Sequence, residues 1–448
     1  MTTDAAKWLK TYRIDDVECM VPDLTGIARG KILPRERFLA SLKSASLRLP
    51  QDIFYQTVTG EYPEPFPGDP TSPDMILNPD ISTLRLVPWY EEPTAQVICD
   101  CVTRDGKPVG VAPRQVLARV LELYAERNWR PVIAPELEFY LVATNKDPDY
   151  PLEPPEGRSG RQEAGSQAYG IDAVNEFDHV MDDLYDFCEA AGVGVDTLIH
   201  ESGPAQLEIN FHHGDPMALA DQVLVFKRAT REAALRHNVY ATFMAKPIEG
   251  EAGSAMHVHQ SIVDTKTGRN VFADAKGRDT KLFHAHVAGL QHYLAAAMPL
   301  FAPNVNSYRR LRADSDAPIN THWGYENRTV GLRVPESDRA GRRVENRVAG
   351  VDVNPYLAIA GTLACGYLGM IEKLEPGKPQ TGDAYRAKGQ GLPSHLPDAL
   401  TRLSRSKPLR EVLGSDFVDL LIAVKHTEFN QYQDVISPWE REHLLLNV

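Results

Sequence analysis

The segment Ile133–Leu141 limits most strongly what this chain can fold into. It is a run of apolar and aromatic residues followed by a polar loop rich in glycine and proline, which is typical of a β-strand. Side chains two residues apart on a strand share a face, so Glu136 and Glu138 point one way and Leu137 and Phe139 the other. Adjacent carboxylates repel each other, and a divalent cation between them would relieve that repulsion. The segment therefore predicts a strand with a cation-binding face.

Three further segments repeat this alternation of polar and apolar residues. They are Gln206–Phe211, Met256–Gln260 and Arg343–Arg347. A single stripe of this kind would be explained by an amphipathic sheet with one face in water. These stripes carry Glu, His and Arg instead of the Lys, Thr and Ser that usually cover a solvent face, so together they favour a shared site.

If the stripes converge, they bring several carboxylates and at least one imidazole together. The candidate metal ligands are Glu136, Glu138, Glu208 and Glu345, with Glu201 nearby in the sequence and His257 on the third stripe. Such ligands suit Mg²⁺ or Mn²⁺, and the absence of thiolates argues against structural zinc. Sites of this kind can hold two or more metal ions that clamp a phosphate during its transfer.

Arginines are concentrated between residues 309 and 347. They are Arg309, Arg310, Arg312, Arg328, Arg333, Arg339, Arg342, Arg343 and Arg347. Arginine matches carboxylate and phosphate oxygens bidentately, so metals beside arginines indicate phosphoryl transfer to an acidic substrate. For Arg309, Arg312, Arg339 and Arg342 a solvated basic loop is the better interpretation.

Composition and motifs exclude several other classes of protein. A formal net charge of −13 argues against a general nucleic-acid binder and is compatible with a cationic small molecule. The chain has no P-loop, dinucleotide-binding, nucleophile-elbow or zinc-protease motif. Its five cysteines form no C-x-x-C pair, and no signal peptide or membrane span is visible. We therefore expect a cytoplasmic enzyme without a nucleic-acid or membrane partner.

The order of predicted elements indicates an α+β fold. Strands expected within 17–33 and 84–102 form a small, mostly β N-terminal domain that ends near residue 105, and residues 50–80 read as a long, partly ordered loop. Helices are expected from Pro113, over 174–191, from Pro216 to about His237, and over 280–300 and 355–373. Helices between half-polar strands predict a larger catalytic domain over 106–448.

On these residues the chain resembles the glutamine synthetase family. The matching stretches are Asp23–Gly26 with Arg29–Lys31, Pro135–Phe139, Glu201 with Gln206–Asn210, Met256–Ser261, Asn306–Leu311, Asn327–Arg328 with Arg333–Pro335, Arg343–Arg347 and Asn354–Tyr356. They follow the family order over nearly the whole chain. The resemblance implies a β-grasp-like N-terminal domain (1–105) and a catalytic domain (106–448) whose antiparallel sheet, flanked by helices, forms a funnel-shaped active site. It also implies a homo-hexamer or dodecamer with active sites between subunits.

The resemblance assigns roles to individual residues. Glu138, Glu201 and Glu208 would hold one metal ion, and Glu136, His257 and Glu345 a second. Arg310 and Arg347 would bind the carboxylate of L-glutamate, and Gly253 would contact its amino end. Arg328, Arg333 and Arg343 would face the phosphates of ATP, with His259 and Ser261 towards the nucleotide.

Three departures from the family pattern concern the nitrogen donor. The Asp-Gly-Ser stretch that helps to bind ammonium is replaced by Leu49–Tyr55, the glutamate of the active-site flap is Asp316, and the asparagine before Gly253 is Ala252. Glutamate and ATP positions are kept while ammonium positions are altered. This pattern resembles the γ-glutamyl-amine ligases, notably the γ-glutamylpolyamine (glutamate–putrescine) synthetases.

We therefore expect ATP to phosphorylate the γ-carboxylate of L-glutamate and a primary amine to displace the phosphate. A polyamine is the first expectation for the amine, and a bulky or aromatic monoamine the next, given Phe54, Tyr55 and Trp323. Glu208 and Asp316 are the candidates for taking the proton from the amine. Two alternatives remain: a glutamine synthetase that uses ammonium, and an inactive ring that acts as a sensor or a structural protein.

Overall fold

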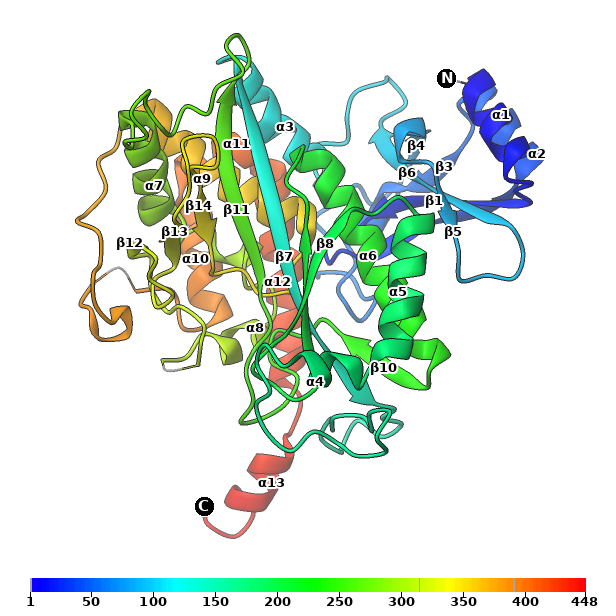
Figure 1. Ribbon diagram of the computed structural model, residues 1–448. Coiled ribbons are helices and arrows are strands. Elements are labelled where there is room, and N and C mark those ends of the chain that lie inside the picture. The colour runs from blue at the N-terminus through cyan, green and yellow to red at the C-terminus, as the bar shows by residue number, and fades with distance from the viewer. Residues whose placement is uncertain (1, 314, 390) are drawn as a thin grey trace.

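Two β-sheets organise the chain, which is described here by a computed structural model for residues 2–313, 315–389 and 391–448. The N-terminal sheet has six strands and lies at one side of the molecule, in blue and cyan, away from the long strands of the second sheet (Figure 1). Its strands are β1 (Asp16–Pro22), β2 (Ala28–Pro34), β3 (Arg48–Pro50), β4 (Asp74–Pro79), β5 (Arg85–Val87) and β6 (Thr94–Val102). The order is β2-β1-β6-β4-β3, with β5 also paired to β6 and with β1 and β6 parallel.

The expected strands of this region are confirmed, and two strands were missed, β3 and β4. β4 lies inside the stretch 50–80 that was expected to be a loop. Met75 and Leu77 of β4 are buried, and β4 pairs with β6, so tertiary pairing creates a strand that the surrounding prolines and glycines obscured. The helices α1 (Thr2–Thr11) and α2 (Arg35–Ser44) accompany this sheet.

The second sheet has eight strands and carries the four polar stripes. Its strands are β7 (Trp129–Ala143), β8 (Val195–His200), β9 (Gln206–Phe211), β10 (Val239–Thr242), β11 (Met256–Asp264), β12 (Trp323–Tyr325), β13 (Leu332–Val334) and β14 (Val344–Asn346). The order is β12-β13-β14-β11-β7-β9-β8, with β10 also paired to β7. All pairs are antiparallel except β12 with β13, so the mixed helix-and-sheet class and the mainly antiparallel sheet are confirmed.

The helices that follow the N-terminal sheet in the chain lie around the second sheet or pack on one another, except the last, which extends away from the body. They are α3 (Pro113–Ala125), α4 (Ile171–Asn175), α5 (Asp178–Ala190), α6 (Pro216–Arg236), α7 (Lys281–Tyr293), α8 (Val305–Arg310), α9 (Pro355–Glu372), α10 (Leu396–Arg405), α11 (Lys407–Leu413), α12 (Ser415–Gln433) and α13 (Pro438–Leu444). The helix expected over 174–191 is two helices, α4 and α5. Asp215 caps α6 by accepting hydrogen bonds from two backbone N–H groups, as Asp before Pro predicts.

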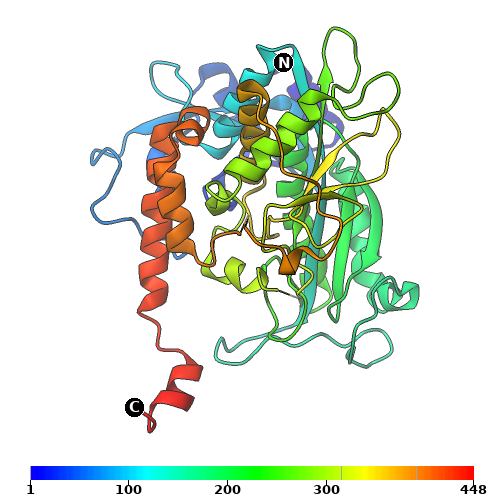
Figure 2. The ribbon, with the colours of Figure 1, turned by 90° about the vertical axis from the view of Figure 1, so that its left-hand side faces the viewer.

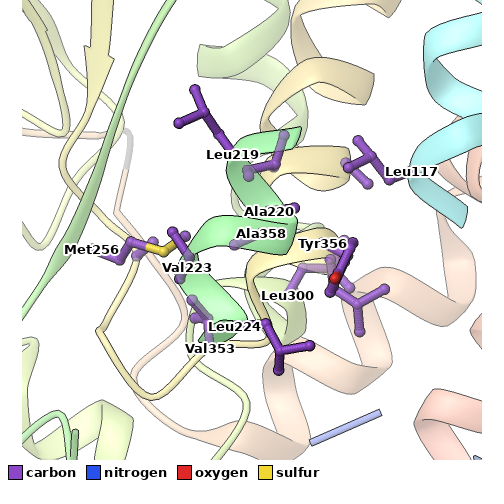
Figure 3. Packing of buried hydrophobic residues seen from close by; sticks show 14 of the residues in the cluster. Leu117, Leu219, Ala220, Val223, Leu224, Met256, Leu300, Val353, Tyr356 and Ala358 are labelled. Carbon is purple, nitrogen blue, oxygen red and sulfur yellow. The ribbon is translucent and has the colours of Figure 1, made fainter. Parts of the chain in front are cut away.

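The core lies between α6, α9 and the back of the sheet. Side chains of α6 such as Val223 and Leu224 lie close to Ala358 of α9 and to Met256 of β11 (Figure 3). α9 is buried along nearly its whole length, which explains why its sequence is apolar on every side. No helix in the described ranges is long and apolar enough to span a bilayer.

Two arginines connect the N-terminal sheet to the helices of the second sheet. Arg114 of α3 forms ion pairs with Asp80 and Asp100 of the first sheet region and with Asp221 of α6. Arg228 of α6 pairs with Glu18 of β1 at 2.7 Å. These contacts fix where the first sheet sits against α3 and α6.

At the other end of the chain, α13 extends away from the body in both views (Figures 1 and 2).

Candidate active site

Strand register aligns most of the predicted metal ligands in one row. On β7, Glu136 lies opposite His257 of β11 and opposite Asn210 of β9. Glu138 lies opposite Glu208 of β9. The two-residue period read from the sequence thus puts the carboxylates of β7 and β9 and the imidazole of His257 on β11 on one face.

β14 extends the row by one strand. Glu345 lies opposite His259 of β11 and opposite Arg333 of β13. Glu201 follows β8, and its backbone N–H donates to the carbonyl of Gln206. This bond holds Glu201 at the start of β9, on the side where Glu138 lies.

Two groups of side chains have potential ligand atoms within 4.8 Å of one another. One is Glu136, His257 and Glu345, the same set that the resemblance implies for the second metal ion. The other is Glu138, Glu208 and His257, so His257 stands where the resemblance implies Glu201. Glu201 lines the same cavity but lies outside this close group.

The donors in this row fit hard divalent cations. They are carboxylate oxygens and one imidazole, without a thiolate, which is the chemistry that Mg²⁺ and Mn²⁺ accept. Oδ1 of Asn210 is buried and has no hydrogen-bond partner within the described part of the chain. Buried polar atoms are rarely left unpaired, and this one lies beside Glu136, so a cation shell offers it a partner.

Burial and repulsion change the pKa of two of these carboxyl groups. Burial, followed by the charge of Glu201, raises the pKa of Glu138 to about 8. Burial, followed by the charge of Glu138, raises the pKa of Glu208 to about 10. A bound cation would keep both groups ionised.

The pKa values of Glu136 and Glu345 are lowered instead, because imidazoles and arginines face these carboxylates. Burial opposes ionisation of Glu136, but hydrogen bonds with His257 and His259 outweigh it and lower its pKa. Glu345 is fully buried, yet the charge of Arg347 lowers its pKa to about 2. These two carboxylates therefore stay charged without a metal ion.

Glu345 is held from two sides by arginines. Nη1 of Arg347 lies 2.6 Å from Oε1 of Glu345, and Nη1 of Arg333 lies 2.9 Å from Oε2. Each carboxylate oxygen has a second lone pair, so these bonds leave acceptor positions free. Glu345 could therefore help to hold a metal ion while it stays paired with both arginines.

A third arginine, Arg343, contacts the row through His259. Nε of Arg343 donates to Nδ1 of His259 at 3.2 Å, and Nε2 of His259 lies 2.9 Å from Oε1 of Glu136. This chain of contacts connects Glu136 to a cationic group on the opposite side from Arg347.

Arg310 and Gly253 lie at the end of the row that contains Glu138. The guanidinium of Arg310 is buried and donates to the carbonyls of Val348 and Arg347. A Cβ on Gly253 would come within 2.6 Å of Cγ of Arg310 and 2.8 Å of the carbonyl of Ala245. Only glycine fits here without displacing Arg310.

Two cavities open on either side of Glu136, and both are lined by Glu136 and Asn210. The carboxylate cavity has a volume of about 380 Å³ and contains Glu138, Glu201, Glu208, His257, Glu345, Gly253, Arg310, Arg347, Asp316, Arg328 and Arg333. The histidine cavity has a volume of about 320 Å³ and contains His259, Ser261, Arg343, His212, His213 and Asp196. The three arginines predicted to face ATP are therefore divided between the cavities.

Asp316 and Arg328 lie at the exposed rim of the carboxylate cavity. Asp316 has a φ of +57°, a left-handed conformation that Asp and Asn tolerate better than most residues. Its carboxylate is thus available to a molecule that enters the cavity, whereas Glu208 is buried in the row.

Sequence reasoning gave no role to Gln206, whose side chain contacts several parts of the site. Its Nε2 donates to the carbonyl of Gly253 at 3.1 Å, to Oγ of Ser254 at 3.2 Å and to Glu138 at 3.4 Å. The polar stripe could have indicated this role, because Gln206 is its first polar residue and shares a strand face with Glu208. Glu163, which contacts His200 beside Glu201, comes from a loop and had no recognisable pattern.

Comparison with known families identifies the region that contains this site. The family model described as glutamine synthetase, catalytic domain, matches residues 110–444.

Individual relatives match over nearly the whole chain. γ-Glutamylputrescine synthetase PuuA of Escherichia coli (strain K12) is 35% identical over 454 residues, covering 100% of this chain and 95% of that protein. Type-1 glutamine synthetase 2 of Dictyostelium discoideum is 34% identical over 439 residues, covering 94% of this chain and 82% of that protein. A solved structure of GmaS without ligand has a TM-score of 0.85 at 26% identity and covers 99% of this chain and 100% of that chain.

Proposed function

Because this chain belongs to the glutamine synthetase family, we propose that it joins the γ-carboxylate of L-glutamate to a primary amine, with ATP as the energy source and γ-glutamyl phosphate as the intermediate. The family membership makes it an ATP-dependent ligase that forms C–N bonds. The observation that carries the proposal is the row of carboxylates between two cavities, with arginines on both sides.

The carboxylate cavity would bind L-glutamate. Arg310 and Arg347 are buried cations in the lining of this cavity. Arginine binds carboxylates bidentately, so these two residues would bind the carboxylate of glutamate. Gly253 leaves room for the amino end, with its position set by the bond from Gln206. L-Glutamate bound in this way would place its γ-carboxylate next to the row of predicted metal ligands.

The histidine cavity would bind ATP, with Arg343 near its phosphates and His259 and Ser261 near the nucleotide. Glu138, Glu201, Glu208, Glu136, His257 and Glu345 would hold two Mg²⁺ or Mn²⁺ ions. Bound metal ions of this kind neutralise the charge of a transferring phosphoryl group.

Chemistry would then follow in two steps. A γ-carboxylate oxygen attacks the γ-phosphorus and ADP leaves, while Arg328 and Arg333 stabilise charge on the phosphoryl oxygens. The amine nitrogen next attacks the acyl carbon, inorganic phosphate leaves, and the excess proton passes to a carboxylate. Asp316 is the better acceptor of that proton because it lies at the open rim.

The choice of amine over ammonium rests on the sequence departures at Leu49–Tyr55, Ala252 and Asp316. The match to γ-glutamylputrescine synthetase over the whole chain supports a polyamine. A relative named glutamine synthetase is almost equally similar, so ammonium is the competing candidate. We also propose, from the family resemblance, a ring of six or twelve subunits with active sites at the contacts between subunits.

One assay tests the proposal. Phosphate release is measured with L-glutamate, ATP and Mg²⁺ and with ammonium, putrescine, spermidine, ethanolamine or 2-phenylethylamine as the acceptor. We expect kcat/KM to be highest for a polyamine, with mass spectrometry showing the γ-glutamylamide. Highest kcat/KM for ammonium would establish glutamine synthesis instead, and no turnover with any acceptor would contradict the ligase assignment.

A further inference from the structure

A third cavity lies behind α8, separate from the two cavities of the active site. Its volume is about 900 Å³. It is lined by the turn between β1 and β2 and by parts of α6, β10, α8 and α12. None of the residues assigned above to metal, glutamate, amine or ATP lines it. We refer to it as the rear cavity.

Positive charge dominates the lining of the rear cavity. Five basic residues line it: Lys227, Arg228, Arg231, Arg309 and Lys425. The acidic residues of the lining are Asp352 and Glu428. This excess is local, because the whole chain has a formal net charge of −13.

Ion pairs neutralise only some of these cations. Arg228 pairs with Glu18, and Lys425 pairs with Glu428. For Lys227, Arg231 and Arg309, the described residues provide no ion pair. Among the described residues, the rear cavity therefore contains more positive charge than its ion pairs neutralise.

Lys227 and Arg231 lie next to each other in this cavity. They are four residues apart on α6, so their side chains share one helix face. Nζ of Lys227 is buried and donates to the backbone carbonyls of Val351 and Val353. Burial, followed by the charge of Arg231, lowers the pKa of Lys227 to about 7, although the charge of Asp352 acts in the opposite direction.

An aromatic surface lies beside these two cations. The guanidinium carbon of Arg231 lies 5.2 Å from the centre of the Phe243 ring. Leu224, Met244 and Phe429 add apolar surface to the lining. The cavity thus combines a pair of cations with a hydrophobic wall, within the usual size of small-molecule sites.

We propose that the rear cavity binds a small organic carboxylate, with its charged end at Lys227 and Arg231 and an aromatic or branched apolar part against Phe243 and Met244. A carboxylate would accept bidentate hydrogen bonds from Arg231 and offset the repulsion between the two cations. This site is independent of which nitrogen donor the active site uses.

The rear cavity shares α8 with the active site. Asn306 and Arg309 line the rear cavity, whereas Arg310 lines the carboxylate cavity. Oδ2 of Asp352 accepts hydrogen bonds from Nδ2 of Asn304 and Oγ of Ser307. The start of α8 is thereby tied to the segment that follows Arg347.

Lys227 supports that same segment through the carbonyls of Val351 and Val353. A ligand that draws Lys227 towards its carboxylate would alter this support. The elements that carry Arg310 and Arg347 would then shift, and the affinity for glutamate would change. By linkage, glutamate would change the affinity of the ligand for the rear cavity by the same factor.

The test uses 4-fluorophenylacetate as the probe and its uncharged amide, 4-fluorophenylacetamide, as the matched control, both followed by ¹⁹F NMR titration. We expect the carboxylate to bind at least tenfold more tightly than the amide. Arg231→Met should weaken its binding at least tenfold. Arg405→Met, at an exposed arginine of α10, should leave binding unchanged, and neither variant should alter activity without the probe.

A second variant tests the same prediction in case Arg231→Met does not fold. Met244 is 40% exposed, so Met244→Glu adds a carboxylate to the lining without disturbing the core, and it should also abolish binding of the probe. A saturating concentration of probe should change the KM for glutamate at least twofold in the unmodified protein and leave it unchanged in Arg231→Met.

Several outcomes would overturn the proposal. Equal binding of the acid and the amide, or unchanged binding by Arg231→Met, would show that the cations do not select the ligand. Full displacement of the probe by L-glutamate, together with loss of probe binding in Arg347→Met, would place it in the active site. Absence of probe binding combined with a changed assembly mass for Arg231→Met would identify the cavity as a contact between subunits. An unchanged KM at saturating probe would overturn the coupling through α8.

Discussion

At the scale of single residues, the proposed function depends on carboxylates that the strand register brings together. Glu138 and Glu208 are opposite each other and buried, an arrangement that is costly unless a proton or a cation compensates it. Arg347 and Arg333 compensate Glu345, but no arginine forms an ion pair with Glu138 or Glu208 in the described ranges. These two carboxylates are thus the positions where a metal ion matters most.

Replacing Glu138 by glutamine should reduce kcat/KM for phosphate release by at least ~100-fold, because a side chain that would bind the metal ion directly contributes more than one that only orients a ligand. The remaining activity should need a higher Mg²⁺ concentration. Glu126→Gln, at an exposed residue just after α3, is the matched control and should behave like the unmodified protein. Full activity of Glu138→Gln would contradict the assigned role of this row.

Binding of Mg²⁺ should release protons and strengthen as the pH rises. The pKa of Glu138 is raised to about 8 and that of Glu208 to about 10, so both groups are largely protonated at neutral pH in the absence of a cation. A metal ion must displace these protons, and its apparent affinity therefore increases between pH 6 and pH 8. Calorimetric Mg²⁺ titrations in buffers of different ionisation enthalpy measure the release directly. Affinity that is independent of pH would contradict the prediction.

Asp316 permits a test of the second chemical step alone. Asp316→Asn keeps the size and the left-handed backbone but removes the charge, so it should slow transfer to the amine by about 10²-fold, as expected for loss of a general base. Formation of γ-glutamyl phosphate, followed by positional isotope exchange in ATP, should continue. Equal loss of both steps would mean that Asp316 acts in glutamate or ATP binding instead.

At the scale of elements, the junction between the N-terminal sheet and α6 depends on one buried arginine. Arg114 contacts Asp80, Asp100 and Asp221, and Asp221 also accepts a hydrogen bond from Tyr356 of α9. Asp221 is only 2% exposed, so water could not compensate its charge if Arg114 were removed. Arg114 should therefore contribute more to the free energy of unfolding than an exposed ion pair does.

Arg114→Met should lower the free energy of unfolding by about 3–5 kcal/mol, since it leaves the buried carboxylate of Asp221 without a cation. Arg402→Met, which removes the exposed pair with Asp398 on α10, should cost no more than about 1 kcal/mol. Urea titrations monitored by circular dichroism compare the two variants. Similar losses for both would show that the junction does not depend on Arg114.

At the scale of the whole molecule, the proposed ring of subunits would complete the carboxylate cavity. In that ring, the N-terminal segment around Asp52 would serve the active site of a neighbouring subunit. The active species should then be a ring of six 49.8 kDa chains or two stacked rings, measured by multi-angle light scattering together with specific activity. A fully active monomer would contradict an active site shared between subunits.

How much the sequence predicts differs between the fold and the site. Helices with a clear local signal are predicted correctly: α3 has an apolar face and a proline at its start, α6 begins with Asp before Pro, and α9 is an apolar run. The strand β4 is missed because pairing with β6 defines it. The polar stripes predict which residues share a strand face, since the period of two is a local property of the backbone. They do not predict that Gln206 contacts Gly253 or that Glu163 reaches His200, because these contacts join segments far apart in the chain.

The sequence by itself determined the strand faces, the type of metal ligand and the family, all of which follow from residue type and local spacing. Only the tertiary structure decided which strands are neighbours, and hence that Glu138 faces Glu208 while Glu345 faces His259 and Arg333. It also divided the arginines between two cavities and formed the rear cavity from five distant elements. The physical reason is that pairing and packing depend on the whole core, whereas the alternation along one strand depends only on its own backbone.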